Sequence, residues 1–145
     1  MIALLQRVRQ AEVCVAGERV GHIGSGLLAL IGVRRQDSAA SAARLAERIV
    51  RYRVFADDAG RMNRSLLDTG GGLLLVPQFT LAAATDRGNR PSFAPAAPPA
   101  LAEPLFAALV GHACGWQVPV QTGRFGAEME VALTNHGPVT FWLEG

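Results

Sequence analysis

Apolar residues in the first part of the chain come in short runs that are separated by turn residues. The chain is apolar with polar breaks from Ile2 to Val15, turns at Ala16-Gly17-Glu18, and is apolar again from Val20 to Ile23. This arrangement predicts a β-hairpin. After a second turn at Gly24-Ser25-Gly26, a continuous apolar run from Leu27 to Val33 predicts a buried strand.

Two main helices are predicted from the spacing of apolar residues. The first extends from about Ala39 to Phe55, after Asp37 or Ser38, either of which can cap it. Its apolar face comprises Ala42, Leu45, Ile49 and Tyr52. The second extends from Leu101 to Cys114 and follows two prolines, which favour a helix N-terminus.

The remaining apolar runs predict four more strands. One follows Gly70-Gly71-Gly72, which we interpret as a turn because no Gly-Lys-Ser/Thr follows it and a strand stands where a phosphate-binding loop needs a helix. The four strands are Leu73 to Val76, Trp116 to Val120, Met129 to Thr134 and Val139 to Leu143. Strands and helices do not alternate regularly, so a mixed or antiparallel sheet is favoured over a doubly wound one.

Length and composition limit the class of protein. A chain of 145 residues with 50% hydrophobic and 18% charged residues predicts one domain with a full core. No apolar run approaches the roughly 18 residues that span a bilayer, and the first residues do not resemble a secretion signal. Cys14 and Cys114 lie too far apart to suggest a disulfide framework or a zinc site, which favours a cytoplasmic location. The net charge of +2 argues against a protein that holds duplex nucleic acid by bulk charge.

The common catalytic motifs are missing, but two segments interrupt strong strand patterns with polar groups. There is no nucleophile elbow and no zinc-protease helix, and the three histidines do not suggest a triad. The first polar segment is Pro77-Gln78-Phe79-Thr80-Leu81, and the second is Asn135-His136-Gly137-Pro138-Val139-Thr140. By spacing alone, each is more often a plain strand end or a turn.

Both segments resemble motifs of the D-aminoacyl-tRNA deacylases. Pro77 to Leu81 resembles the family's Ser-Gln-Phe-Thr-Leu motif, and Asn135 to Thr140 resembles its Asn-x-Gly-Pro-Val-Thr motif. Three further matches, Ile2 to Val8, Arg87 to Phe93 and Gln121 to Gly126, extend the resemblance over nearly the whole chain. The resemblance implies hydrolysis of the ester that joins a D-amino acid, or the achiral glycine, to the 3′-terminal ribose of tRNA.

The resemblance also implies how substrates are selected. The Gly137-Pro138 bond is expected to be cis, and the pair from one subunit is expected to enter the active site of the other, so that a homodimer forms the site. Its backbone carbonyls would exclude an L side chain and act as a chiral filter. Arg7 matches a position that orients this loop, and Asn135 belongs to the same motif.

The expected catalytic residues are Gln78, Phe79 and Thr80. A nucleophilic Thr80 needs a general base, and neither motif offers one except His136. We therefore favour attack assisted by the 2′-hydroxyl of the substrate, with the segment supplying backbone donors and shape. Phe125 and Met129 are expected near the terminal adenine, although both are equally compatible with core positions.

Two residues depart from the family motifs. Pro77 stands where the family has serine, which removes a hydroxyl and a backbone N–H. His136 stands where the family usually has aspartate, and we expect it to make activity depend on pH near neutrality.

We predict a single α/β (α+β) domain over residues 1–145, with a mixed, largely antiparallel, barrel-like sheet and two main helices. It is expected to be a cytoplasmic homodimeric esterase that acts on the 3′ end of aminoacylated tRNA without a metal or other cofactor and without binding membrane or DNA. One alternative is a non-catalytic RNA-binding protein that keeps the fold. Another is a cysteine-dependent hydrolase that uses Cys14 or Cys114.

Overall fold

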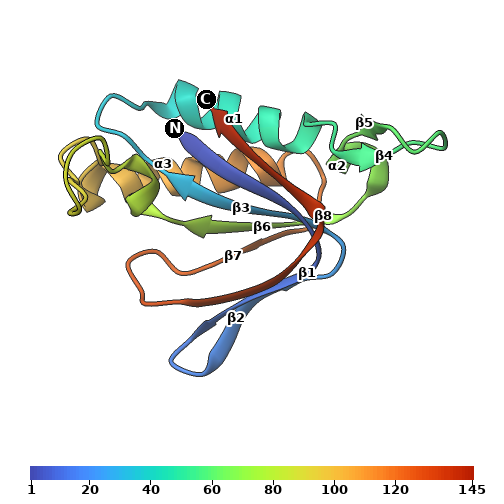
Figure 1. Cartoon of the computed structure of the whole chain (residues 1–145), viewed down its shortest axis with the longest axis horizontal. Coiled ribbons are helices and arrows are strands. Elements are labelled where there is room, and N and C mark those ends of the chain that lie inside the picture. Colours follow the sequence, from blue (N-terminus) through green and yellow to red (C-terminus); the bar gives the residue numbers. More distant parts are fainter.

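A curved six-stranded sheet forms the centre of the computed structural model, which describes residues 1–145 (Figure 1). Its strands are β1 (Ile2–Val15), β2 (Glu18–Ile23), β3 (Gly26–Gly32), β6 (Gly72–Pro77), β7 (Val120–Thr122) and β8 (Glu130–Glu144). The long strand β1 pairs antiparallel with β8, β3 and β2, whereas β3, β6 and β7 are parallel. The predicted mixed, largely antiparallel sheet is therefore confirmed.

The sheet curls until its two ends nearly meet, which confirms the barrel-like shape. β2 and β7 lie at opposite ends of the strand order and are not paired with each other. They nevertheless pack closely, since a Cβ atom added at Gly21 would lie 2.6 Å from the carbonyl oxygen of Thr122. Only glycine permits this approach, so the barrel closes by packing at a seam between β2 and β7.

Two main helices, α1 (Ala39–Arg51) and α3 (Pro99–Cys114), cover one face of the sheet (Figure 1). Ser38 caps α1, because its hydroxyl accepts a hydrogen bond from the Ser41 N–H. The predicted apolar face is largely correct, because Ala42, Leu45 and Ile49 are buried. The largest cluster of buried residues joins this face to α3 and the sheet.

The predicted end of the first helix is wrong. The helix ends at Arg51, and Tyr52 is already extended. Phe55 instead lies in the short strand β4 (Phe55–Ala56), which pairs with β5 (Met62–Arg64). Two further short elements were not predicted, α2 (Leu66–Thr69) and the 3₁₀ helix η1 (Phe79–Ala82).

The strands near the C-terminus also differ from the prediction. The strand expected at Trp116 to Val120 lies later, as β7 (Val120–Thr122). The two strands expected at 129–134 and 139–143 form the single strand β8, and the segment between them does not reverse the chain. Both halves of β8 pair with β1. Between them β8 has more residues than the facing part of β1, and the pairing shifts register on either side of Val8.

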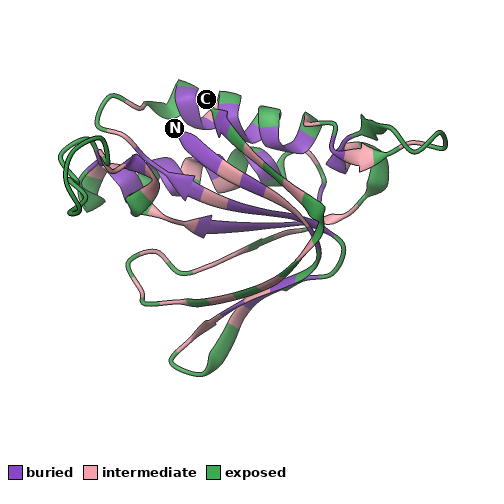
Figure 2. Cartoon of the chain, viewed as in Figure 1, coloured by how far each residue is buried: buried purple, intermediate pink, exposed green.

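Buried residues run along β1, β3 and β6 (Figure 2), and a second, smaller cluster takes those that alternate with the residues of the largest cluster, among them Leu28, Leu74 and Val76. The half-buried Met129, Val131 and Leu133 pack against it from β8 and its approach. This part of β8 is therefore incompletely covered by the chain itself. No helix of the structure is long and apolar enough to cross a membrane.

Candidate active site

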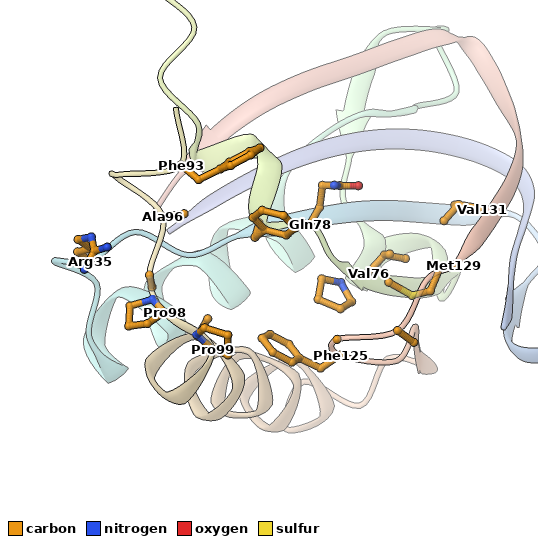
Figure 3. Close-up of a pocket in the computed structure, with 16 residues that line it drawn as sticks. Arg35, Val76, Gln78, Phe93, Ala96, Pro98, Pro99, Phe125, Met129 and Val131 are labelled. Carbon is orange, nitrogen blue, oxygen red and sulfur yellow. The ribbon is translucent and has the colours of Figure 1, made fainter. Parts of the chain in front are cut away.

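A cavity of about 550 Å³ lies where β6 ends (Figure 3). Its volume lies within the usual range for small-molecule sites, and its lining is mostly apolar. The lining residues come from five parts of the chain, and those used below are Arg35, Pro77, Gln78, Phe79, Phe93, Phe125 and Met129. The cavity therefore brings together four of the predicted site residues, Gln78, Phe79, Phe125 and Met129.

Aromatic rings form two sides of this cavity. Phe79 and Phe93 are exposed by 57% and 43%, and their ring centroids lie 5.1 Å apart. Phe125 is half-buried and packs on Phe106, with the ring centroids 6.4 Å apart. Met129 is held beside it, since its sulfur accepts a hydrogen bond from the Arg124 N–H. Phe125 and Met129 thus contact the core and also line the cavity, and the rings offer flat surfaces for a base.

The Gln78–Thr80 turn forms the polar edge of the cavity. The N–H of Gln78 donates to the carbonyl oxygen of Ile31 at 2.7 Å, and η1 then begins at Phe79. The N–H groups of Phe79 and Thr80 stand at the start of η1 and have no acceptor within this helix. The Gln78 side-chain amide donates to the Thr80 hydroxyl at 2.5 Å, and no carboxylate or imidazole is hydrogen-bonded to that hydroxyl. The turn therefore offers donors but no activated nucleophile.

Pro77 removes no hydrogen bond between β6 and β3. Successive N–H groups of a strand point to opposite sides, and that of Gln78 points to β3. Position 77 therefore faces β7, whose pairing with β6 ends at Leu75 and Thr122. The proline therefore lacks an N–H on the edge of β6 that faces away from β3, just beyond the last residue pair of β6 and β7.

The second predicted segment forms a loop within β8. The Gly137-Pro138 peptide bond is cis, which confirms the expectation from the resemblance. Gly137 has a φ of +145°, and a Cβ atom there would lie 2.6 Å from Cγ2 of Val139 and 3.2 Å from the Arg7 guanidinium. Both the backbone conformation and the close packing therefore require glycine.

Asn135 and Arg7 hold this loop in place. The Asn135 amide oxygen accepts from the Val139 N–H at 2.7 Å, and its nitrogen donates to the Thr140 hydroxyl at 2.9 Å. Arg7 donates from Nε to the His136 carbonyl oxygen at 2.9 Å and from Nη1 to the Val54 carbonyl oxygen. The loop is thus held by Asn135 from β8 itself and by Arg7 from the neighbouring strand β1.

His136 is exposed beside the loop and close to two arginines. Its Nε2 lies 3.2 Å from a guanidinium nitrogen of Arg9. The positive charge of Arg9, followed by partial desolvation and the charge of Arg7, lowers the pKa of His136 below 6.5. A neutral imidazole that accepts a hydrogen bond from Arg9 is consistent with this arrangement.

The structure does not bring all the predicted residues together in one chain. Arg7, Asn135, Gly137 and Pro138 do not line the cavity. Thr80 does not line it either, but its hydroxyl is hydrogen-bonded to Gln78, which does. Neither Cys14 nor Cys114 lines it. No three His, Cys, Asp or Glu side chains are grouped as metal ligands.

Two residues of the cavity were not singled out from the sequence. Phe93 ends a segment that matches the family, so its aromatic ring was a signal that could have been used. Arg35 was one arginine among fourteen and carried no signal of its own. It is the charged residue of the cavity lining, which only the folded chain reveals.

Comparison with known proteins gives a consistent result. Residues 4–144 match the family described as D-Tyr-tRNA(Tyr) deacylase. A D-aminoacyl-tRNA deacylase of Thioalkalivibrio sulfidiphilus (strain HL-EbGR7) is 67% identical over 144 residues, which cover 99% of this chain and 97% of that protein.

Two solved structures share the fold. One, titled c-Myc DNA Unwinding Element Binding Protein, is 34% identical with a TM-score of 0.94, covering 100% of this chain and 99% of that one. The other, titled as a probable eukaryotic D-amino acid tRNA deacylase, has a TM-score of 0.85 at 14% identity, covering 99% and 98%.

Proposed function

Because this chain belongs to the D-Tyr-tRNA(Tyr) deacylase family and is therefore an aminoacyl-tRNA hydrolase, we propose that it removes D-amino acids and glycine from the 3′-terminal ribose of tRNA. Family membership also argues against the non-catalytic and cysteine-dependent alternatives. Its substrate is formed where translation takes place, so we place the reaction in the cytoplasm. The observation that carries the proposal is the cavity, which joins aromatic surfaces for a base to the donors of the Gln78–Thr80 turn.

The terminal adenosine occupies the cavity, with its base against Phe125 and Met129. Stacking on an aromatic ring is worth about 1–3 kcal/mol, which is substantial for a site that reads one nucleotide. The ester carbonyl then lies at the Gln78–Thr80 turn. The free N–H groups at the start of η1 stabilise the negative charge that develops on the carbonyl oxygen.

The reaction needs no nucleophile from the protein. Water attacks the ester carbonyl carbon with assistance from the 2′-hydroxyl of the ribose, the bond from that carbon to the 3′ oxygen breaks, and the 3′ oxygen takes up the proton. The products are the free amino acid and tRNA. This scheme agrees with the absence of a base on the Thr80 hydroxyl, whose hydrogen-bond partner is the Gln78 amide.

The Gly137-Pro138 pair acts as the chiral filter of a partner subunit. D and L residues differ in which Cα substituent faces a given wall, so a fixed wall of backbone atoms excludes one hand whatever the side chain is. Glycine carries no side chain and passes. Within one chain the pair does not line the cavity, and β8, which carries it, leaves Val131 and Leu133 half-buried. Both features are explained if a second copy completes the site.

Release of amino acid from D-tyrosyl-tRNA, L-tyrosyl-tRNA and glycyl-tRNA, with a chelator present, tests the reaction and its selectivity. We expect release from the D and glycyl forms and none from the L form. Equal release from D and L would exclude the chiral filter. No release from the D form would exclude the proposed reaction.

Mixing two inactive variants tests whether the site is shared between subunits. Gly137→Ala alters the filter, and a Gln78→Ala, Phe79→Ala double variant alters the cavity. Random exchange gives half mixed dimers with one intact site each, so activity returns to about a quarter of the wild-type value. If each site belongs to one chain, the mixture stays inactive.

A further inference from the structure

We propose that Arg35 binds the phosphate group on the 5′ side of the terminal nucleotide. The inference rests on the proposed function, since it assigns a contact within the same substrate. Arg35 lies at one end of the cavity, beyond Pro98 and Pro99, whereas Met129 and Val131 lie at the other (Figure 3). A nucleotide whose base lies against Phe125 and Met129 has its phosphate directed away from that end.

Arg35 carries the charge of a cavity that is otherwise lined by uncharged residues. Its Nε donates to the carbonyl oxygen of Ala94 at 2.6 Å, which orients the guanidinium at the rim. The two terminal nitrogens have no hydrogen-bond partner, and Arg35 takes part in no ion pair. A guanidinium held on one side and free on the other matches the geometry of a phosphate group.

The neighbouring Arg34 differs from Arg35, because its guanidinium is paired with a carboxylate of the same chain. Arg34 makes two hydrogen bonds to the Glu144 carboxylate, at 2.8 and 3.2 Å. These bonds, together with one from Trp142, lower the pKa of Glu144 to about 2. Arg34 is thus used to bind the end of β8, whereas Arg35 remains available for a ligand.

The backbone around Arg35 does not depend on its side chain. The Arg35 N–H donates to the Pro95 carbonyl oxygen, and the Ala97 N–H donates to the Val33 carbonyl oxygen. Arg34 and Ala96 form a β-bridge at the same place. Substitution of the Arg35 side chain therefore leaves this wall of the cavity joined to the end of β3, and variants at this position are expected to fold.

The test compares substrates with and without the phosphate. The substrates are D-tyrosyl-tRNA, the 3′-D-tyrosyl ester of adenosine and the same ester of adenosine 5′-monophosphate. Arg35→Gln removes the charge, and Arg35→Lys keeps it. Arg61→Gln removes another exposed charge, in the β4–β5 hairpin at the other end of the molecule (Figure 1).

For wild type, we expect the phosphorylated ester to have a KM about three- to fivefold lower than the adenosine ester, as for an exposed ion pair. Arg35→Gln abolishes this preference and raises the KM for D-tyrosyl-tRNA by the same factor, with kcat unchanged. The slope of log affinity against log salt falls by about 0.7. Arg35→Lys retains most of the preference, and Arg61→Gln behaves like wild type.

Two results would overturn the proposal. Equal impairment of Arg35→Gln and Arg35→Lys on both esters would show that Arg35 only supports the loop at Ala94. An unchanged preference in Arg35→Gln would place the phosphate elsewhere. If wild type hydrolyses none of the substrates, the proposed reaction fails, and calorimetric binding of adenosine 5′-monophosphate against adenosine still decides the role of Arg35.

Discussion

The Gly137–Pro138 loop and the Gln78–Thr80 turn both interrupt the sheet with polar groups, but they are held in opposite ways. The loop is fixed by the Asn135 side chain, by Arg7 and by the close approach of Val139. The turn has one short backbone hydrogen bond to Ile31, and its middle residue, Phe79, is largely exposed. A rigid backbone suits exclusion of a wrong substrate, whereas an open cavity edge suits admission of a flexible nucleotide. The predictions below test this division.

The largest expected effect is that of Gly137→Ala. The new Cβ atom would lie 2.6 Å from Val139, so the loop must shift. A displacement of this kind lowers turnover of D-tyrosyl-tRNA about 100-fold. Gly60→Ala is the matched control, because Gly60 also has a positive φ but has nothing within 4 Å. Equal activity of the two variants in single-turnover assays would show that the loop need not be rigid.

Asn135→Ala is expected to weaken selectivity more than folding. The loss of three hydrogen bonds at this side chain costs about 1–3 kcal/mol of unfolding free energy. Release of L-tyrosine from L-tyrosyl-tRNA rises, because the loop is no longer fixed at Val139. Asn135→Asp keeps the acceptor for the Val139 N–H and is expected to lie between Asn135→Ala and wild type. Unchanged rejection of the L substrate by Asn135→Ala would show that Asn135 is not needed to hold the loop in its selective position.

Thr80→Ala is expected to keep activity within about tenfold of wild type, because the hydroxyl is bonded to an amide and to no base. Thr80→Ser retains the hydroxyl and serves as the control. Deacylation rates of both variants are measured beside their circular dichroism spectra. An inactive but folded Thr80→Ala with an active Thr80→Ser would identify Thr80 as a nucleophile. The Gln78–Thr80 turn would then do more than admit the substrate.

The smallest expected effect is that of pH on the loop. The pKa of His136 is lowered, chiefly by Arg9, so the imidazole is neutral at pH 7 and activity is flat from pH 7 to 8. The folded chain binds fewer protons than the unfolded one, so this contribution to stability is complete above the unfolded pKa of 6.5 and is lost as the pH falls below it. Protonation repels Arg9 and Arg7, and activity falls by less than about threefold at acid pH. His136→Asn should give a flat profile, and a flat wild-type profile from pH 5.5 to 8 would remove the effect.

Local patterns in the sequence were sufficient for most elements of the fold. The hairpin of β1 and β2, the buried strands β3 and β6 and the apolar face of α1 follow from periodicity and turn residues. The end of α1 and the unity of β8 could not be predicted in this way. Both depend on pairing with distant strands, since β4 takes Phe55 and β1 aligns both halves of β8.

The site was predicted in parts. The resemblance named Gln78, Phe79, Phe125 and Met129, which the fold brings to one cavity, and it named the loop residues, which the fold keeps apart from it. The role of Arg35 depends on which arginine remains unpaired after folding. Arg34 and Arg35 are adjacent in sequence, but in the fold Arg34 binds Glu144, whereas Arg35 donates to Ala94 at the cavity.

The seam between β2 and β7 has a consequence for hydrogen exchange. Strands joined by packing at Gly21 and Thr122 can separate without breaking a ladder of backbone hydrogen bonds. Amide protons of β7 should therefore exchange with solvent faster than those of β1, which is paired on both edges. Because Gly123 and Phe125 follow β7 directly, each opening of the seam loosens the wall of the cavity against which the base lies. Fast exchange should therefore extend from β7 through the segment that carries Phe125.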